Sequence, residues 1–467
     1  MLHIDKPDTL MKEELHITAS SLVPNELYEI FLRLNHFMGT FMSRGVFCAD
    51  DLGEIDVSTM APLRGTYSGV RPMGLFEGLL PCEDFRYGNY CKCTPPNPFK
   101  FDVELRDCTG KVLCSVPIIK RWIHPAVVRR EIEEDGLCGT LFKPPGDGPF
   151  PTILDMSGAG GGINEHKGAT LSSEGFCVFS LAFFQYKTLI SDLNDLDLDY
   201  FRKAIHWLIA LPFTRKEIGI QGVSFGGLLV NMLAVRHPEI IAVCSINGGH
   251  VISEYARIKE NGKILPYTDT PTNMLYYLNQ TMCYDKTVKY MVVTEEADMK
   301  VETAPKRTAF RYVSFQKILA SRYTARRLSH VASRVIMHRR CGTAQQTGGG
   351  CRRQVFHGTN ASLDDLSTPT VFVTRLHEKK LKESGHYVEV DFAPGGHLME
   401  PPYFPGHQVV YAKIAGCIQA YGGEPCLHGA GQNKIWPNTV AFFKRFLGEP
   451  QPLEDYREMS EAPRSHL

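Results

Sequence analysis

The sequence predicts two structural parts, an all-β segment followed by an α/β segment with a mainly parallel sheet. Residues 1–125 contain short runs in which apolar and polar residues alternate between turn residues, with no long helical period. From about residue 137, apolar strands alternate with helical patterns, which implies βαβ crossovers. A glycine-flanked serine between one of these strands and the next helix is a third indication of an α/β architecture.

Length and composition exclude several classes of protein. The 467 residues, 43% of them hydrophobic and 22% charged, are typical of a globular chain of two or three domains, not of a disordered or fibrous one. Lys and Arg number 51, as do Asp and Glu, so the chain lacks the basic excess on which nucleic-acid binders depend. No run approaches the roughly 18 apolar residues of a membrane-spanning helix. We therefore expect a soluble protein with no transmembrane segment and no nucleic-acid partner.

The same patterns predict the individual elements. In the first part, a small antiparallel sandwich is expected to include strands at 27–34, 101–105 and 112–118. A turn-rich connector at 144–149 precedes the alternating part. There we expect strands at 151–156, 177–182, 218–221, 240–246 and 387–392, and helices at 200–211 and 228–236. The predicted domains are 1–125 and 137–448, followed by a C-terminal tail at 449–467.

One segment departs from the rest of the chain in charge. Residues 304–363 contain no Asp or Glu, whereas Lys and Arg recur, including the pairs Arg326-Arg327 and Arg339-Arg340. We interpret about 300–352 as an insertion within the second domain, or a mis-assembled exon, that forms a solvated basic loop. The alternative is an anion-binding arm.

The 14 cysteines favour a reducing compartment. Most stand alone in apolar runs, as Cys114, Cys177 and Cys244 do, where free thiols behave as small hydrophobic side chains. Cys91 and Cys93 have the wrong spacing for a CxxC redox or zinc motif, and no His/Cys pair at zinc-finger spacing accompanies them. We expect no structural metal and no cofactor.

The run Gly222-Val223-Ser224-Phe225-Gly226-Gly227 has the pattern of a nucleophile elbow. It lies between the predicted strand 218–221 and a helical run, so Ser224 would occupy a sharp strand-to-helix turn. The Phe225 amide would then lie at the helix N-terminus, facing a developing oxyanion. A glycine-rich structural turn is the alternative.

A glycine-rich loop follows the predicted strand 151–156. In a fold with a nucleophile elbow, the second oxyanion donor comes from the loop after an early strand, where glycines let the backbone approach the substrate. The candidate donors are the amides of Ser157, Gly158, Ala159 and Gly160. A nucleotide-binding loop is excluded because no Gly-Lys-Ser/Thr and no ribose-binding acid follow.

A serine nucleophile needs a general base, and the best candidate is His397. It follows the predicted strand 387–392 and two glycines, which allow the loop to carry the imidazole over the elbow. His250 is a weaker candidate because it precedes every plausible acid, whereas the order in this architecture is Ser, acid, His.

Several motifs occur together over about residues 15–290 and 360–448. They are 68–76 (SGVRPMGLF), 157–162 (SGAGGG), 182–186 (AFFQY), Tyr200-Phe201, 222–227 (GVSFGG) and 396–405 (GHLMEPPYFP). In these motifs the chain resembles the acyl-CoA thioesterases and bile acid-CoA:amino acid N-acyltransferases. That resemblance implies an immunoglobulin-like β-sandwich followed by an α/β-hydrolase domain.

The resemblance also implies the position of the acid. In this family the acid follows a strand and precedes a helix that leads to the histidine strand. With a helix at 376–385, the acid falls on the pair Asp364-Asp365, of which Asp365 fits better. The preceding strand, expected at 353–358, has a poor pattern and adjoins the basic segment.

The family divides by its nucleophile, which is cysteine in the amino-acid transferases and serine in the hydrolases. Ser224 therefore favours a hydrolase that cleaves fatty acyl-CoA through a Ser224–His397–Asp365 triad. Transfer of the acyl group to glycine or taurine is one alternative. A non-catalytic acyl-binding protein, with a triad broken by the insertion, is another.

The last three residues, Ser465-His466-Leu467, are a variant of the Ser-Lys-Leu peroxisomal address. They predict a peroxisomal location and the import receptor as a partner. A chance tail on a cytoplasmic protein is the alternative.

Overall fold

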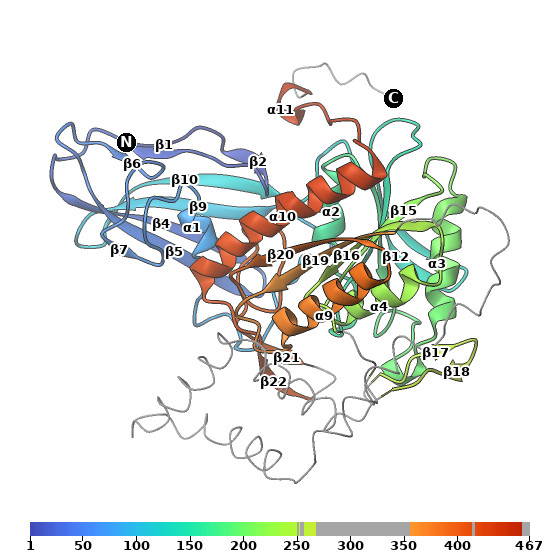
Figure 1. The fold of residues 1–467 in the computed structure, drawn as a ribbon. Coiled ribbons are helices and arrows are strands. Elements are labelled where there is room, and N and C mark those ends of the chain that lie inside the picture. Colours follow the sequence, from blue (N-terminus) through green and yellow to red (C-terminus); the bar gives the residue numbers. More distant parts are fainter. Residues whose placement is uncertain (250–251, 253–255, 268–354, 413–415, 460–467) are drawn as a thin grey trace, which may run out of the picture.

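The computed structural model describes residues 1–249, 252, 256–267, 355–412 and 416–459. Within them, a strand-rich N-terminal part lies beside a larger part that consists of a central sheet with helices on both faces (Figure 1). Most of the basic segment, His250 and the C-terminal tripeptide lie outside these residues.

The N-terminal part contains two sheets. The larger has the order β2-β10-β9-β4-β5-β7, with β8 also paired to β5. Its strands are β2 (Asp8–Leu10), β4 (Leu27–His36), β5 (Gly39–Cys48), β7 (Arg64–Gly65), β8 (Leu80–Pro81), β9 (Phe99–Arg106) and β10 (Val112–Arg121). The smaller consists of β1 (Leu2–Ile4), β3 (Ile17–Ala19) and β6 (Ile55–Asp56). The three strands predicted in this part are confirmed as β4, β9 and β10.

One pairing in the larger N-terminal sheet differs from the expected antiparallel arrangement. β2 pairs with β10 in parallel, whereas the other pairs are antiparallel. About a hundred residues separate these two strands in the sequence, so a long connection joins them and the antiparallel hairpin rule does not apply.

The second part is built on a sheet of the order β11-β12-β14-β13-β15-β16-β19-β20. Its strands are β11 (Val128–Glu134), β12 (Leu137–Lys143), β13 (Thr152–Met156), β14 (Cys177–Ala182), β15 (Ile218–Val223), β16 (Ile240–Ile246), β19 (Phe356–Ser362) and β20 (Tyr387–Ala393). β12 is antiparallel to both of its neighbours, and all other pairs are parallel. This is the α/β-hydrolase arrangement, and β14 and β16 have the predicted limits.

Helices cover both faces of this sheet. Figure 1 shows α2 (His166–Ser172) and α10 (Pro425–Leu447) on one face, with α3 (Leu198–Ala210), α4 (Phe225–Ala234) and α9 (Thr370–Glu383) on the other. α4 begins three residues before its predicted start, because Phe225 and Gly226 form its first turn directly after the elbow. α9 begins six residues before its predicted start.

The remaining elements are α1 (Gly74–Glu77), η1 (Leu193–Asp195), α11 (Tyr456–Met459), and the hairpins β17 (Lys259–Glu260)–β18 (Lys263–Ile264) and β21 (Val409–Ala412)–β22 (Cys417–Ala420). Among the described helices, none has the length and apolar character needed to cross a membrane.

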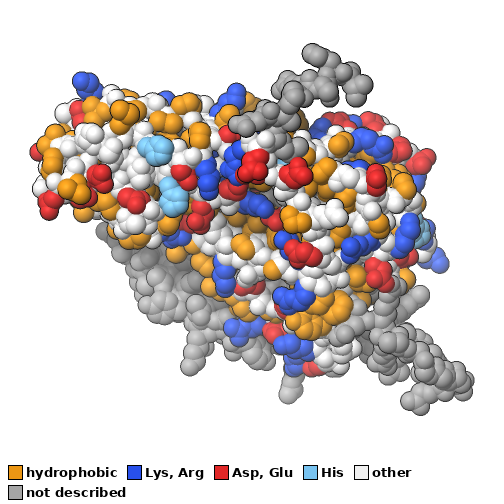
Figure 2. All heavy atoms as spheres, turned by 90° about the horizontal axis from the view of Figure 1, so that it is seen from above, with side chains coloured by type: hydrophobic (Ala, Val, Ile, Leu, Met, Phe, Trp, Pro, Cys, Tyr) orange, Lys and Arg blue, Asp and Glu red, His pale blue; other side chains and the backbone are white. Residues whose placement is uncertain are grey.

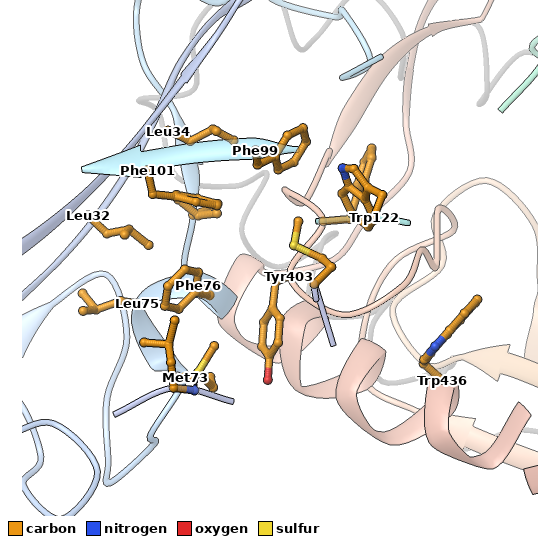
Figure 3. Close-up of a cluster of buried hydrophobic side chains, with 14 of the residues drawn as sticks. Leu32, Leu34, Met73, Leu75, Phe76, Phe99, Phe101, Trp122, Tyr403 and Trp436 are labelled. Carbon is orange, nitrogen blue, oxygen red and sulfur yellow. Dashed lines mark hydrogen bonds between the residues drawn. The ribbon is translucent and has the colours of Figure 1, made fainter. Parts of the chain in front are cut away.

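A continuous hydrophobic core joins the two parts. Figure 3 shows Phe76 between Phe101 of β9 and Tyr403 of the segment that follows His397. The Phe76 ring lies 5.3 Å from that of Phe101 and 5.9 Å from that of Tyr403, centroid to centroid. The N-terminal part therefore packs directly against the segment that carries the predicted base.

The described cysteines are free thiols, as the sequence predicts. Cys177 and Cys244 are fully buried, and burial raises the pKa of each to about 12. These two thiols are therefore neutral and act as hydrophobic side chains. Cys114, expected in the core, is only partly buried.

The surface shows no segregation of charge on the face seen in Figure 2. Basic and acidic side chains lie intermingled there, with apolar ones between them. This distribution agrees with the formal net charge of zero.

A buried carboxylate, Glu400, connects the two parts three residues after His397. The Tyr90 hydroxyl donates to Oε1 at 2.6 Å, His166 Nε2 donates to Oε2 at 2.7 Å, and Lys167 Nζ forms an ion pair with the same Oε2. Burial alone would raise the pKa of the Glu400 carboxyl, but Lys167 and His166 hold that pKa well below its usual range. The carboxylate is therefore charged, and it ties α2 to the loop that follows His397.

We expect Glu400→Gln to lower the free energy of unfolding by about 3–5 kcal/mol, because the Lys167 ammonium stays buried without an opposite charge. Urea denaturation at neutral pH measures the change. Glu378→Gln is the control, because Glu378 pairs with Lys382 on the largely exposed side of α9 and its loss should cost less than about 1 kcal/mol. Equal losses in the two variants would contradict the prediction.

The contribution of Glu400 should also depend on pH. Its folded-state pKa lies below the ordinary value of 4.5, so its contribution is complete above about pH 4.5 and is lost as the pH falls toward the lowered pKa. The difference in unfolding free energy between wild type and Glu400→Gln should therefore be larger at about pH 7 than at about pH 3. Denaturation curves at both pH values test this, and a constant difference would contradict it.

Candidate active site

Ser224 lies at a sharp turn between β15 and α4. Its backbone has φ 57° and ψ −118°, in a region that residues other than glycine rarely adopt. A Cβ at Gly222 would lie 2.4 Å from the carbonyl carbon of Gly226, and one at Gly226 would lie 2.3 Å from the Ser157 carbonyl oxygen. Both positions therefore require glycine, as the elbow motif predicts.

The predicted oxyanion loop lies directly beside this turn. A Cβ at Gly158 would lie 3.0 Å from the Ser224 Cβ and 3.6 Å from its Oγ, so the loop backbone approaches the nucleophile at Gly158. Ser157 is buried, and Ala159 is partly buried against the hydrophobic core of the second part. At Gly160 a Cβ would meet nothing within 4 Å. Phe225 is the first residue of α4, so its amide has no intrahelical acceptor.

The structure brings the predicted base and acid together with Ser224. His397 Nε2 lies 2.7 Å from Ser224 Oγ, and His397 Nδ1 lies 2.7 Å from Asp365 Oδ2. The side chains of His397 and Asp365 are only 2% and 1% exposed. Because an ionised carboxylate only accepts, Nδ1 carries the proton and Nε2 is left to accept from the serine hydroxyl.

Separate hydrogen bonds fix each member of the Asp364-Asp365 pair. Asp365 Oδ1 accepts from the amides of Ser367 at 2.8 Å and Thr368 at 2.9 Å, which orients Oδ2 toward the histidine. Asp364 Oδ2 instead accepts from the Gly423 amide at 2.8 Å. Only Asp365 contacts His397, whereas Asp364 anchors the turn at Gly423.

Tyr421, which lies just before the turn at Gly423, contacts His397 through both its ring and its backbone. The Tyr421 ring stacks on His397 with centroids 5.3 Å apart and an angle of 25° between the planes, and the His397 amide donates to the Tyr421 carbonyl at 2.8 Å. Burial and the Asp365 carboxylate raise the pKa of the Tyr421 phenol, so this side chain is neutral. His397 therefore lies between Ser224, Asp365 and the face of the Tyr421 ring.

This arrangement can activate a serine hydroxyl as a nucleophile. The hydrogen-bonded order serine, histidine, carboxylate provides a base for the hydroxyl proton and a carboxylate that stabilises the resulting imidazolium. Within the described residues, no group of three or more His, Cys, Asp or Glu side chains is arranged to hold a metal ion.

Three residues that contact or support this site were not predicted from the sequence. Tyr421 stacks on the base, Asn247 hydrogen-bonds to its carbonyl, and Glu400 anchors the loop that follows it. Glu400 belongs to the run that resembles the family, which is the one signal that could have identified it. No local pattern marks Asn247 or Tyr421.

Comparison with known proteins gives the family. The model of the acyl-CoA thioester hydrolase/BAAT N-terminal region matches residues 12–134. The model of the BAAT/acyl-CoA thioester hydrolase C-terminal region matches residues 196–331 and 359–449. The chain belongs to this family. Its resemblance to acyl-CoA thioesterases and bile acid-CoA:amino acid N-acyltransferases is thus confirmed.

Curated relatives align over nearly the whole chain. Acyl-coenzyme A amino acid N-acyltransferase 1 of Mus musculus is 27% identical over 94% of this chain and 96% of its own length. Acyl-coenzyme A thioesterase 1 of Homo sapiens is 27% identical over 93% of this chain and 94% of its own length. The peroxisomal succinyl-coenzyme A thioesterase of Mus musculus is 26% identical over the same shares.

Similarity to solved structures is weaker. The acylaminoacyl peptidase of Pyrococcus horikoshii is 13% identical with a TM-score of 0.37, over 96% of this chain and 61% of that protein. The fold assignment rests instead on the strand order and pairing described above.

Proposed function

We propose that the protein is an acyl-CoA thioesterase, which hydrolyses fatty acyl-CoA to a free fatty acid and CoA. The observation that carries this proposal is the hydrogen-bonded chain from Ser224 through His397 to Asp365, with 2.7 Å between the atoms of each pair. It occurs in a member of a family whose relatives are named as acyl-CoA thioesterases and N-acyltransferases.

In the first half of the proposed reaction, Ser224 Oγ attacks the thioester carbonyl carbon while His397 Nε2 takes its proton. Asp365 stabilises the imidazolium. The carbonyl oxygen becomes an oxyanion, and its proposed donors are the Phe225 amide and an amide of the Ser157–Gly160 loop. The tetrahedral intermediate then expels the CoA sulfur, which leaves as a thiol with the proton from His397.

In the second half, a water molecule resolves the acyl-serine ester. His397 Nε2 removes a proton from the water, whose oxygen attacks the ester carbonyl at the same oxyanion site. Collapse of this intermediate returns the proton to Ser224 Oγ and releases the fatty acid. These steps use residues of this chain and need no metal or prosthetic group.

Transfer to an amino acid is the second candidate, because the N-acyltransferase of Mus musculus is as similar as the human thioesterase. The nucleophile favours hydrolysis. The family resemblance implies a cysteine at the elbow of the transferases, whereas this chain has Ser224 and would form an oxyester for water to resolve. Incubation with acyl-CoA in the presence and absence of glycine or taurine separates the two. Conjugate in place of free acid would favour the transferase.

We also propose two features of organisation and location. Residues 1–125 form an immunoglobulin-like sandwich ahead of a catalytic domain at 137–448, followed by a tail at 449–467. The C-terminal Ser465-His466-Leu467 directs the protein to peroxisomes through the import receptor. The name of the peroxisomal relative in Mus musculus supports that location. Imaging of the chain with and without its last three residues tests it.

Ser224→Ala should abolish acyl-CoA hydrolysis and leave the unfolding transition unchanged, because the hydroxyl acts chemically. Loss of a triad member typically lowers kcat by several orders of magnitude. Thiol release from acyl-CoA measures the rate, and a fluorophosphonate should label wild type but not the variant. Turnover within about tenfold of wild type would require another nucleophile. Failure of wild type to be labelled would favour a non-catalytic acyl-binding protein.

Asp365→Asn should lower kcat by about 10³- to 10⁴-fold, because an amide permits the wrong imidazole tautomer and cannot stabilise the imidazolium. Asp364→Asn is the matched control. Its amide oxygen can still accept from the Gly423 amide, so turnover should change little. Both variants should keep KM near the wild-type value. Greater loss in Asp364→Asn would assign the acid to the neighbouring residue.

A further inference from the structure

Asn247 lies at the point where the catalytic loops meet, directly after β16. Its side-chain Nδ2 donates to the His397 carbonyl at 2.8 Å and to Ser362 Oγ at 2.8 Å. Its Oδ1 accepts from the Ser362 amide, also at 2.8 Å. Asn247 is 1% exposed, so water does not compete for these groups.

These bonds link Asn247 to the proposed base and to the end of the strand that precedes the proposed acid. Ser362 ends β19 three residues before Asp365, and the His397 carbonyl belongs to the base itself. The residue before Asn247, Ile246, accepts a hydrogen bond from the Ser224 amide at 2.9 Å. Two consecutive residues at the end of β16, Ile246 and Asn247, therefore contact the proposed nucleophile, the start of the acid loop and the proposed base.

The chemistry of these contacts selects asparagine. The Ser362 amide is a donor and the His397 carbonyl is an acceptor, so one side chain must both accept and donate at its tip. Aspartate only accepts when ionised, and an apolar side chain does neither. The backbone also fits, because Asn247 has φ 48° and asparagine tolerates this left-handed region better than most residues.

We propose that Asn247 is a positioning residue that holds the His397 backbone at the distance at which the imidazole reaches both Ser224 and Asp365. This inference rests on the proposed function. Without the amide, the His397 carbonyl loses the hydrogen bond from the Asn247 side chain, and a displacement of about 1 Å costs about 10²-fold in rate. A looser pairing with Asp365 also stabilises the imidazolium less.

The test uses the full chain with Asn247→Asp and Asn247→Ala. Asn247→Asp keeps the size and the acceptor of the side chain but lacks the donor. It therefore tests the proposal even if Asn247→Ala fails to fold. We expect kcat to fall by about 10- to 100-fold with KM within about twofold of wild type. The acidic limb of the pH profile of kcat should move to lower pH.

Asn360→Ala is the matched control. Asn360 is also a buried asparagine and lies near the carboxyl end of β19. Its Nδ2, however, donates to Thr439 Oγ1 of α10 at 2.9 Å and not to His397. This variant should lose stability and yet keep the wild-type pH profile. A shifted profile in Asn360→Ala would show that general destabilisation causes the effect and would overturn the proposal.

A double-mutant cycle tests whether Asn247 affects kcat through the His397–Asp365 pair. If Asn247 acts through the His397–Asp365 pair, Asn247→Asp should cost less than about threefold in the Asp365→Asn background. If Asn247→Asp lowered kcat by the same factor in the Asp365→Asn background as in wild type, the result would contradict the proposal.

The rate of fluorophosphonate labelling of Ser224 provides a readout that needs no acyl-CoA. Slower labelling in Asn247→Asp, with no acyl-CoA hydrolysis by wild type, would support the positioning role and reject the proposed substrate. Normal hydrolysis by wild type together with unchanged labelling, kcat and pH profile in both Asn247 variants would overturn the positioning role alone. A wild-type protein that the probe does not label would overturn it as well.

Discussion

The close approach of three backbone segments around Ser224 is the constraint on which the catalytic geometry depends. The carbonyl of Ser157 lies where a side chain at position 226 would be, and the carbonyl of Gly226 lies where one at position 222 would be. The first turn of α4 therefore packs closely against the loop after β13. This contact brings the Gly158 backbone close to the Ser224 side chain, and a larger residue at either glycine would prevent it.

The position of His397, the proposed base, depends on a different set of contacts, which reach into the N-terminal part. The loop that carries His397 continues through Glu400, whose carboxylate binds α2 and Tyr90, to Tyr403, whose ring lies against Phe76 in the shared core. Farther along, His407 accepts a hydrogen bond from the Cys91 amide at 3.1 Å. The N-terminal part thus supports the loop that carries His397.

Whether the sequence predicted a residue's role depends on how far along the chain its interaction partners lie. The elbow, the glycine-rich loop and His397 depend on neighbours within a few residues, so local patterns identified them. Asn247 bonds to residues 115 and 150 positions away, and Glu400 bonds to Tyr90 across 310 positions, so no window of sequence contains those contacts. α10 was missed for a related reason. Gly429 and Pro437 argue against a helix locally, yet Gly429 is where α1 approaches α10 closely, since a Cβ there would lie 2.6 Å from that of Glu77.

The position of the acid illustrates why a parallel sheet tolerates a long connection between neighbouring strands. A triad broken by the insertion was one of the alternatives that the sequence left open. In the structure, β16 and β19 pair in register from Ala242 with Phe356 to Ile246 with Asn360, on the two sides of that segment. Beyond the last pair, the Asn247 amide donates to the Asn360 carbonyl at 3.0 Å and its side chain binds Ser362. The ladder and this extension determine where β19 ends, so the position of Asp365 depends on the strand register and not on the length of chain between the two strands.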